Sequence, residues 1–137
     1  MSGSPVKELR VALAADDYES ALRFYRDALG LPVLSSWERE SGSGTILDAG
    51  RATLELLSPA QAEEIDQIEV GESGVSGLLR IALEVSDSVE VAGRLAAAGA
   101  EELGEPVLTP WSDRNVRLRT PEGIQLTLFT PLEDDAS

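Results

Sequence analysis

Leu9-Arg10-Val11-Ala12-Leu13 returns 70 residues later in the chain as Leu79-Arg80-Ile81-Ala82-Leu83. Two further blocks repeat in the same order at similar offsets. Pro32-Val33-Leu34, followed by Trp37, returns as Pro106-Val107-Leu108, followed by Trp111, and residues 52–59 return as 124–131. Ordered blocks at offsets of 70, 74 and 72 residues indicate one supersecondary unit that is used twice. The space between the two halves is therefore where we first expect a functional site.

The composition predicts one globular domain over residues 1–137. The chain is 42% hydrophobic, which is sufficient for a core. It has no apolar run long enough to span a bilayer, and its first five residues lack the features of a signal peptide. We therefore expect a cytoplasmic protein with no membrane partner. Because the chain has no cysteine, disulfides, thiolate nucleophiles and cysteine-based metal sites are excluded.

The chain is strongly acidic. The formal net charge is −14, so the surface should repel nucleic acids and anionic membranes. The acidity would suit a cationic ligand, or it is simply a solvated surface that keeps the protein soluble. The chain also has no histidine, so a serine–histidine catalytic pair is excluded.

The spacing of apolar residues and caps predicts β-α-β-β-β in each half. In the first module, residues 7–68, we expect strands at 7–14, 32–38, 45–49 and 52–57 and a turn at 41–44. Its first helix starts after Asp17 and ends at Gly30, with Phe24 and Tyr25 as core residues, and a short acidic helix at 59–68 is capped by Ser58. A glycine-rich linker at 69–77 follows. The second module, 78–132, has strands at 78–85, 106–111, 115–119 and 124–130 and a helix at 88–98 capped by Asp87. The acidic tail 133–137 is expected to fray.

This order predicts an α+β fold, in which two paired modules form a curved, mostly antiparallel sheet around a cleft. Strand parity places many polar side chains opposite the aliphatic residues that face the helices, which would be costly in a dry core. We therefore expect the inner face to form a wet cleft. The residues of this face are Arg10, Ala12, Thr53, Glu55, Arg80, Ala82, Glu84, Arg117, Arg119, Gln125 and Thr127.

The ordered motifs over residues 7–131 resemble the vicinal oxygen chelate superfamily, the group of glyoxalase I, extradiol dioxygenases and bleomycin-resistance proteins. The motifs are the two modules, Asp17 before a helix with Phe24-Tyr25, Leu29-Gly30-Leu31, and Thr120-Pro121-Glu122-Gly123 before the last strand. The resemblance implies a homodimer. It also implies metal ligands on the first and last strands of each module, at positions held here by Arg10, Arg80, Glu55 and Thr127.

Only Glu55 among these four has a donor suited to a metal, because arginine is a permanent cation without a free lone pair. We therefore expect no metal and no other cofactor. A buried network in which Glu55 pairs with Arg10 and Arg80 would fill such a site without any function. A hard-cation site made of Glu55, Glu84 and Asp48 is the alternative with a metal.

Trp37 and Trp111 suggest a ligand. They are the only tryptophans of the chain, and the repeat makes them equivalent. They either pack against the other module or a dimer partner, or form aromatic walls for a flat or cationic guest, with Phe129 as a third contact. Arg10, Arg80, Glu55, Arg117, Arg119 and Thr127 would then orient the guest.

Four function classes remain open. The leading hypothesis is metal-independent binding of a small molecule, for example sequestration of a large aromatic or DNA-damaging antibiotic as in self-resistance. A metal-independent isomerase, cyclase or lyase with Glu55 or Glu84 as general base is the alternative. A metal-dependent glyoxalase or dioxygenase comes third. A partner-binding module without a pocket is the fourth.

Overall fold

The computed structural model describes residues 3–72, 77–121 and 123–132. The first half contains β1 (Val6–Ala14), α1 (Tyr18–Leu22) with a π-helical continuation η1 (Arg23–Ala28), β2 (Val33–Arg39), β3 (Gly42–Asp48) and β4 (Thr53–Leu57). The helix α2 (Pro59–Val70) follows. The second half contains β5 (Leu79–Val85), α3 (Ser88–Ala97), β6 (Glu101–Glu102), β7 (Val107–Leu108), β8 (Asp113–Arg119) and β9 (Gln125–Pro131).

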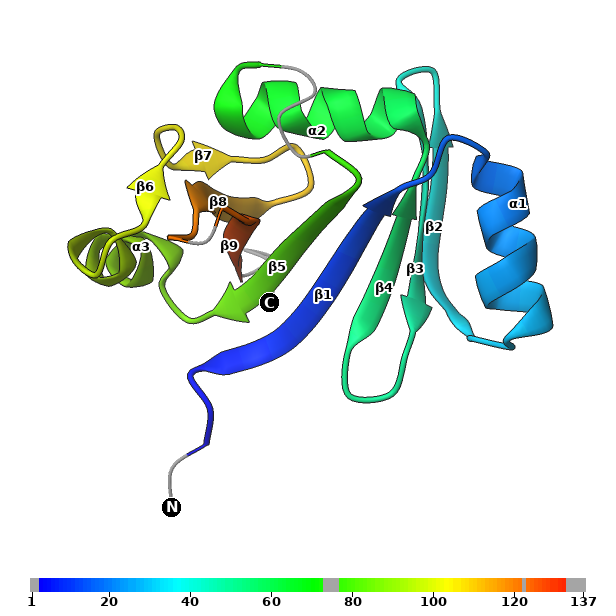
Figure 1. The fold of residues 1–137 in the computed structure, drawn as a ribbon, viewed down its shortest axis with the longest axis horizontal. Helices are drawn as coiled ribbons and strands as arrows, with labels where there is room; N and C mark the ends of the chain where they lie inside the picture. Colours follow the sequence, from blue (N-terminus) through cyan, green and yellow to red (C-terminus); the bar gives the residue numbers. More distant parts are fainter. Residues whose placement is uncertain (1–2, 73–76, 122, 133–137) are drawn as a thin grey trace.

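The strands form one curved sheet, which confirms the predicted α+β fold. The order is β2-β3-β4-β1-β5-β9-β8-β6, with β7 also paired to β8. The pairs β1–β4 and β5–β9 are parallel and the others antiparallel. The two halves join along β1 and β5, where Val11 lies opposite Ile81. The sheet is therefore continuous through the centre of the molecule (Figure 1).

Two apolar cores cover one face of the sheet. Leu22 of α1 packs with the buried Leu47, Leu54 and Leu56. On the other half, Ala92 of α3 packs in a second cluster of buried residues: Val85, Val116, Leu118, Leu126 and Leu128. The opposite face is crossed by α2, whose Ile65 packs on Ala12 and Leu57. The fold thus places α2 over the polar face of the sheet (Figure 1).

The predicted helix caps are present. Asp17 accepts a hydrogen bond from the backbone nitrogen of Ser20 at 3.0 Å, and Asp87 accepts one from that of Glu90 at 3.1 Å. Ser58 accepts from the backbone nitrogen of Gln61 at 3.3 Å. Gly30, with φ of 92°, follows the end of the first helix as expected for a left-handed residue. Among the described residues, no helix is long and apolar enough to cross a membrane.

Two predicted boundaries in the first half are wrong, one of a turn and one of a helix. The segment 41–44 is not a turn, because β3 begins at Gly42 and only Glu40 and Ser41 turn the chain. The helix at 59–68 extends to Val70, so the linker does not begin at Glu69; Gly71, with φ of 83°, ends the helix. Within the predicted linker, residues 73–76 lie outside the described residues, as do Glu122 and the tail 133–137.

Two further predictions fail in the structure. The strand at 106–111 is reduced to Val107–Leu108, because residues 109–112 turn and Ser112 adopts a φ of 71°. Phe24 is not a core residue, since 62% of it is exposed. It lies in η1, where Leu29 donates its backbone N–H to the carbonyl of Phe24 five residues earlier. Tyr25, the next residue, packs against the core of the first half, because adjacent residues of a helix point in different directions.

Candidate functional site

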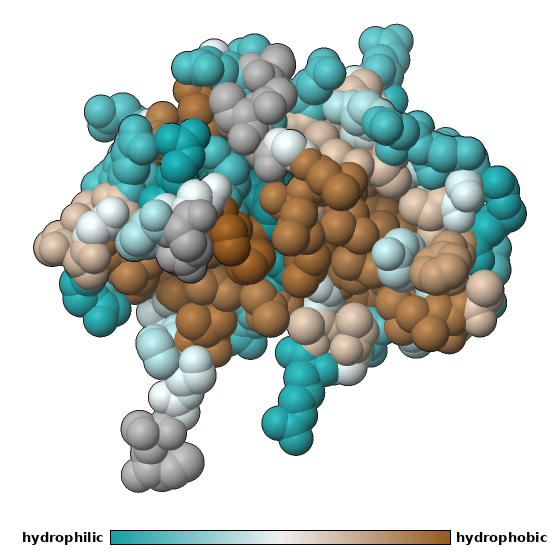
Figure 2. Space-filling model, viewed as in Figure 1, coloured by the Kyte–Doolittle hydropathy of each residue, from teal (hydrophilic) through white to brown (hydrophobic). Residues whose placement is uncertain are grey.

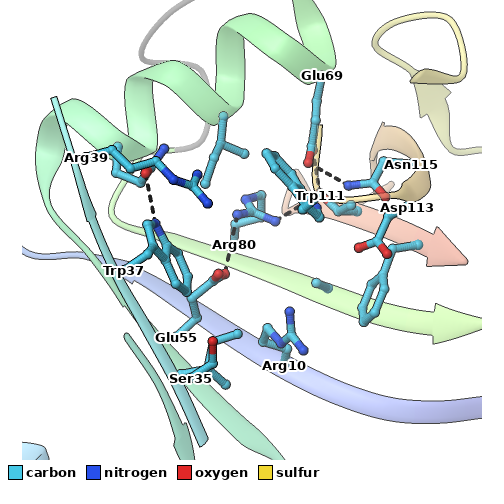
Figure 3. A pocket seen from close by; sticks show the side chains of 16 residues that line it. Arg10, Ser35, Trp37, Arg39, Glu55, Glu69, Arg80, Trp111, Asp113 and Asn115 are labelled. Carbon is cyan, nitrogen blue, oxygen red and sulfur yellow. Dashed lines mark hydrogen bonds and ion pairs between the residues drawn. The ribbon is translucent and has the colours of Figure 1, made fainter. Parts of the chain in front are cut away.

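A pocket of about 250 Å³ lies between the polar face of the sheet and α2. Its floor comes from the central strands, and its two sides come from β2 and from the region around the start of β8 (Figure 3). Both halves of the repeat therefore contribute to it. The lining residues are Arg10, Ser35, Trp37, Arg39, Ile46, Glu55, Gln61, Ile65, Glu69, Arg80, Ala82, Trp111, Asp113, Asn115, Thr127 and Phe129.

Glu55 is a buried carboxylate on the pocket floor, only 8% exposed. Its Oε1 lies 3.9 Å from Nη2 of Arg80, which is an ion pair beyond hydrogen-bonding distance. No side chain or backbone group of the described residues donates a hydrogen bond to it. Burial raises the pKa of Glu55, and the positive charges of Arg80 and Arg10 oppose this rise only in part. Glu55 is thus an acceptor that a guest can reach.

The two floor arginines are held by neighbouring side chains. Nη1 of Arg80 donates to Oγ1 of Thr127 at 3.0 Å. Nη2 of Arg10 donates to Oε2 of Glu8 at 2.9 Å, and the Arg10 guanidinium lies 5.1 Å from the ring centroid of Phe129. This cation–π contact fixes a positive charge beside an aromatic face of the pocket.

Trp37 is held rigidly on its side of the pocket. Its indole Nε1 donates to Oε1 of Gln61 at 2.9 Å, and Nε2 of Gln61 donates to Glu64 at 2.7 Å. The ring lies on Gly44, where an added Cβ would stand 2.2 Å from Cζ2 of the indole. Gly44 therefore makes room for the ring to rest on the backbone of β3.

A buried ionic cluster connects α2 to the second half. Arg117, which is fully buried, pairs with Asp66 at 3.1 Å and with Glu69 at 2.7 Å. Oε2 of Glu69 also accepts a hydrogen bond from Nδ2 of Asn115 at 2.8 Å. One guanidinium thus faces two carboxylates, and Thr127 donates a further hydrogen bond to Glu69. The main effect of the cluster is to hold α2 above the pocket.

The structure brings together seven of the residues proposed from the sequence. They are Arg10, Trp37, Glu55, Arg80, Trp111, Thr127 and Phe129, and all line the pocket. The other three do not line it. Arg117 lies in the ionic cluster, Arg119 is exposed and pairs with Glu101 at 3.0 Å, and Glu84 lies outside the lining.

Several lining residues were missed by the sequence analysis. Arg39 and Asp113 each stand two positions after a tryptophan of the repeat, so the repeat itself was a usable signal. Gln61 lies in the first turn of the predicted helix at 59–68, and nothing in the sequence assigned its side chain to the site. Glu69 was predicted in the linker, but α2 continues through it, and this extra turn brings Glu69 to the pocket.

The four positions that the resemblance assigns to metal ligands do not fit a divalent ion. Arg10 and Arg80 carry positive charge and no free lone pair. The Thr127 hydroxyl already accepts from Arg80 and Arg117 and donates to Glu69. In the described part of the chain, no three histidine, cysteine, aspartate or glutamate residues come close enough to hold a metal, so the alternative site of Glu55, Glu84 and Asp48 does not form.

Comparisons with known proteins agree with this fold. The model of the Glyoxalase/Bleomycin resistance protein/Dioxygenase superfamily matches residues 9–128. The uncharacterized protein YraH of Bacillus subtilis is 35% identical over 60 residues, which is 44% of this chain and 45% of that protein, so the match spans less than half of that relative.

Two solved structures share the architecture along nearly the whole chain. The hypothetical protein BH1468 of Bacillus halodurans has a TM-score of 0.68 at 20% identity and covers 91% of this chain and 94% of its own. The methylmalonyl-CoA epimerase of Mycobacterium tuberculosis has the same TM-score and identity, with coverages of 97% and 93%. At this identity the likeness shows the fold alone.

Proposed function

The chain belongs to the Glyoxalase/Bleomycin resistance protein/Dioxygenase superfamily, and we propose that within it the protein binds a small, flat organic molecule without a metal ion. One observation supports this most strongly. Trp37, Trp111 and Phe129, which come from both halves of the chain, line one pocket together with charged side chains. Aromatic walls with a few polar anchors are typical of small-molecule sites.

The size of the pocket limits the guest. At about 250 Å³ it is smaller than most pockets that enclose a drug-sized molecule. A compact aromatic compound would enter whole, whereas a large DNA-damaging antibiotic would insert only one ring system between the walls. We propose that the protein sequesters such a compound in the cytoplasm and in this way provides self-resistance.

Tryptophan fluorescence tests the proposal directly. We expect a saturable change in emission with at least one planar antibiotic or aromatic acid, and its loss in both Trp37→Ala and Trp111→Ala. Phe24→Ala is the matched control, because it removes an exposed aromatic residue outside the pocket. Divalent metals should leave the Tm unchanged, since a ligand stabilises the protein that binds it. A saturable metal-dependent rise in Tm would contradict metal-independent binding.

Proton transfer by Glu55 is a second candidate function. Its carboxylate accepts no hydrogen bond from the described residues, and burial raises its pKa toward the range of a useful base. Arg80 would then hold an oxygen of the substrate that becomes negative. We expect slow deuterium uptake from D₂O at the carbon next to the carbonyl of a small 2-oxo acid. Glu55→Gln should remove this exchange, whereas Glu84→Gln, outside the pocket, should retain it. Equal exchange without protein would reject this function.

We also propose that two copies pair through the outer face of the central strands. Apolar side chains gather there between α1 and α3 (Figure 2), including Leu9 and Leu79, which are 39% and 45% exposed. Two copies of this surface could face each other across a two-fold axis, as in an isologous dimer. Sedimentation should show a dimer that Leu79→Glu separates. Leu108→Glu, an exposed leucine on β7, is the control and should leave the dimer intact.

A further inference from the structure

The two side walls of the pocket carry opposite charges at equivalent positions of the repeat. Trp37 and Arg39 come from β2, whereas Trp111 and Asp113 come from the turn and the start of β8. Each charged residue follows its tryptophan by two positions, and each pair is separated by the same 74 residues. Figure 3 shows Arg39 beside Trp37 on one side and Asp113 near Trp111 on the other. The duplicated unit thus retained its aromatic residue and changed the sign of the charge beside it.

Neither wall charge has a partner of opposite sign. Among the described residues, the Arg39 side chain makes no ion pair or hydrogen bond, and the Asp113 side chain makes no ion pair. The other charged groups that line the pocket do have such partners: Arg10 pairs with Glu8, Arg80 with Glu55, and Glu69 with Arg117. The wall charges are therefore available to a guest.

Of the two wall charges, Asp113 has the greater need of a partner. It is partly buried, and burial raises its pKa, while the positive charge of Arg10 and a hydrogen bond from the Trp111 side chain oppose that rise. A carboxylate that loses water without gaining a cation is destabilised. A positively charged or N–H-donating group on a bound molecule would remove this cost.

From this arrangement we infer that the guest is dipolar: a flat ring with an anionic group toward Arg39 and a cationic or N–H-donating group toward Asp113. The inference rests on the proposed function, because it assigns chemistry to the same pocket. Aromatic walls related by the repeat cannot distinguish the two ends of a flat ring. The opposite charges do so, since the reversed molecule would place like charges together.

Four simple compounds test the inference by tryptophan fluorescence. The dipolar probes are 4-(aminomethyl)benzoate and the longer 4′-(aminomethyl)biphenyl-4-carboxylate. The singly charged controls are 4-methylbenzoate, which has only the anion, and 4-methylbenzylamine, which has only the cation. We expect the better dipolar probe to bind about tenfold more tightly than either control, because each added charged hydrogen bond contributes to affinity. Equal affinity for the dipolar and singly charged probes would overturn the inference.

Charge variants assign each end of the probe to its wall. Arg39→Glu should lower the affinity for the anionic and dipolar probes about tenfold and leave the affinity for the cationic probe unchanged. Asp113→Asn should lower the affinity for the cationic and dipolar probes and leave the affinity for the anionic probe unchanged. The combined variant Arg39→Asp with Asp113→Arg should regain affinity for the dipolar probe, which binds in the reversed direction. Arg51→Glu and Asp27→Asn, outside the pocket, are the matched controls.

The outcomes separate this inference from the proposed function. Binding that is lost in Trp37→Ala and Trp111→Ala but weakens equally for all probes in the charge variants would reject the dipolar guest and retain the aromatic pocket. Binding that does not depend on the tryptophans, or no binding of any probe, would reject both.

Discussion

Trp37 and Trp111 stand at equivalent positions of the repeat, yet the structure supports them differently. Trp37 lies in β2, rests on Gly44 and donates a hydrogen bond to Gln61. Trp111 lies in the turn before β8 and is 37% exposed. A repeat in sequence therefore preserves a residue without preserving its surroundings. We call the Trp37 side of the pocket, which is packed on β3, the fixed wall; the Trp111 side lies on a turn and is more exposed.

Removing each indole should give the largest difference between the two walls. We expect Trp37→Ala to reduce the free energy of unfolding by about 3 kcal/mol, because a packed, hydrogen-bonded ring is lost. Trp111→Ala should reduce it by about 0.5 kcal/mol, as for an exposed residue. Denaturant unfolding followed by circular dichroism measures both. Equal losses would show that the two walls are equally packed.

A substitution of Gly44 tests whether the backbone of β3 holds the Trp37 ring in place. We expect Gly44→Ala to cost about 2 kcal/mol, because its Cβ would overlap the Trp37 ring and force it to move. The emission spectrum of Trp37, measured with Trp111→Phe in the background, should shift as well. Gly93→Ala in α3 is the control: its Cβ meets no atom within 4 Å, and alanine favours a helix. A Gly44→Ala protein as stable as the native one would show that the ring does not depend on this glycine.

This glycine also shows what the sequence could and could not predict. The strands, the caps at Asp17, Ser58 and Asp87, and the repeat follow local rules of spacing and hydrogen bonding, so they could be predicted. The segment around Gly42 and Gly44 has the composition of a turn, but these glycines serve close approach instead. A Cβ at Gly42 would collide with the backbone of Gln61, and one at Gly44 with Trp37. The contact of Gly42 depends on where α2 lies, and the contact of Gly44 depends on the register of β2 against β3, which the sequence alone does not give.

The candidate site was predictable to a similar extent. Parity identified the floor residues, including Glu55 and Arg80, because the alternation within a strand is local. Glu69 was missed because its role depends on how far α2 continues, and Gly71 ends the helix only after that residue. Arg119 was assigned to the cleft by the same parity, but it lies near the end of β8, beyond the reach of the pocket.

A substitution of Gln61 tests whether the hydrogen bond from α2 holds the Trp37 ring in place. We expect Gln61→Leu to cost about 1 kcal/mol, because the Trp37 indole would lose its acceptor. Affinity for the aromatic probes should fall as the ring gains freedom, without a change in their charge selectivity. Glu63→Leu, an exposed position on the same helix, is the control. An unchanged Trp37 spectrum in the Gln61 variant would indicate that Gly44 alone positions the ring.

The pocket floor gives the last and smallest test, because Glu55 and Thr127 are also equivalent in the repeat and differ in charge. Burial raises the pKa of Glu55 above its ordinary value of 4.5, so the folded protein holds this proton more tightly than the unfolded chain does. The stability that this group contributes is present below its ordinary pKa and is lost as the pH rises through the raised one. Glu55→Gln should therefore be more stable than the native protein at pH 7, with the gain disappearing near pH 4. Thermal unfolding across this range measures it. A less stable variant at pH 7 would mean that the attraction of Arg80 outweighs burial, and Glu55 would then be a fixed counter-ion rather than an acceptor for the guest.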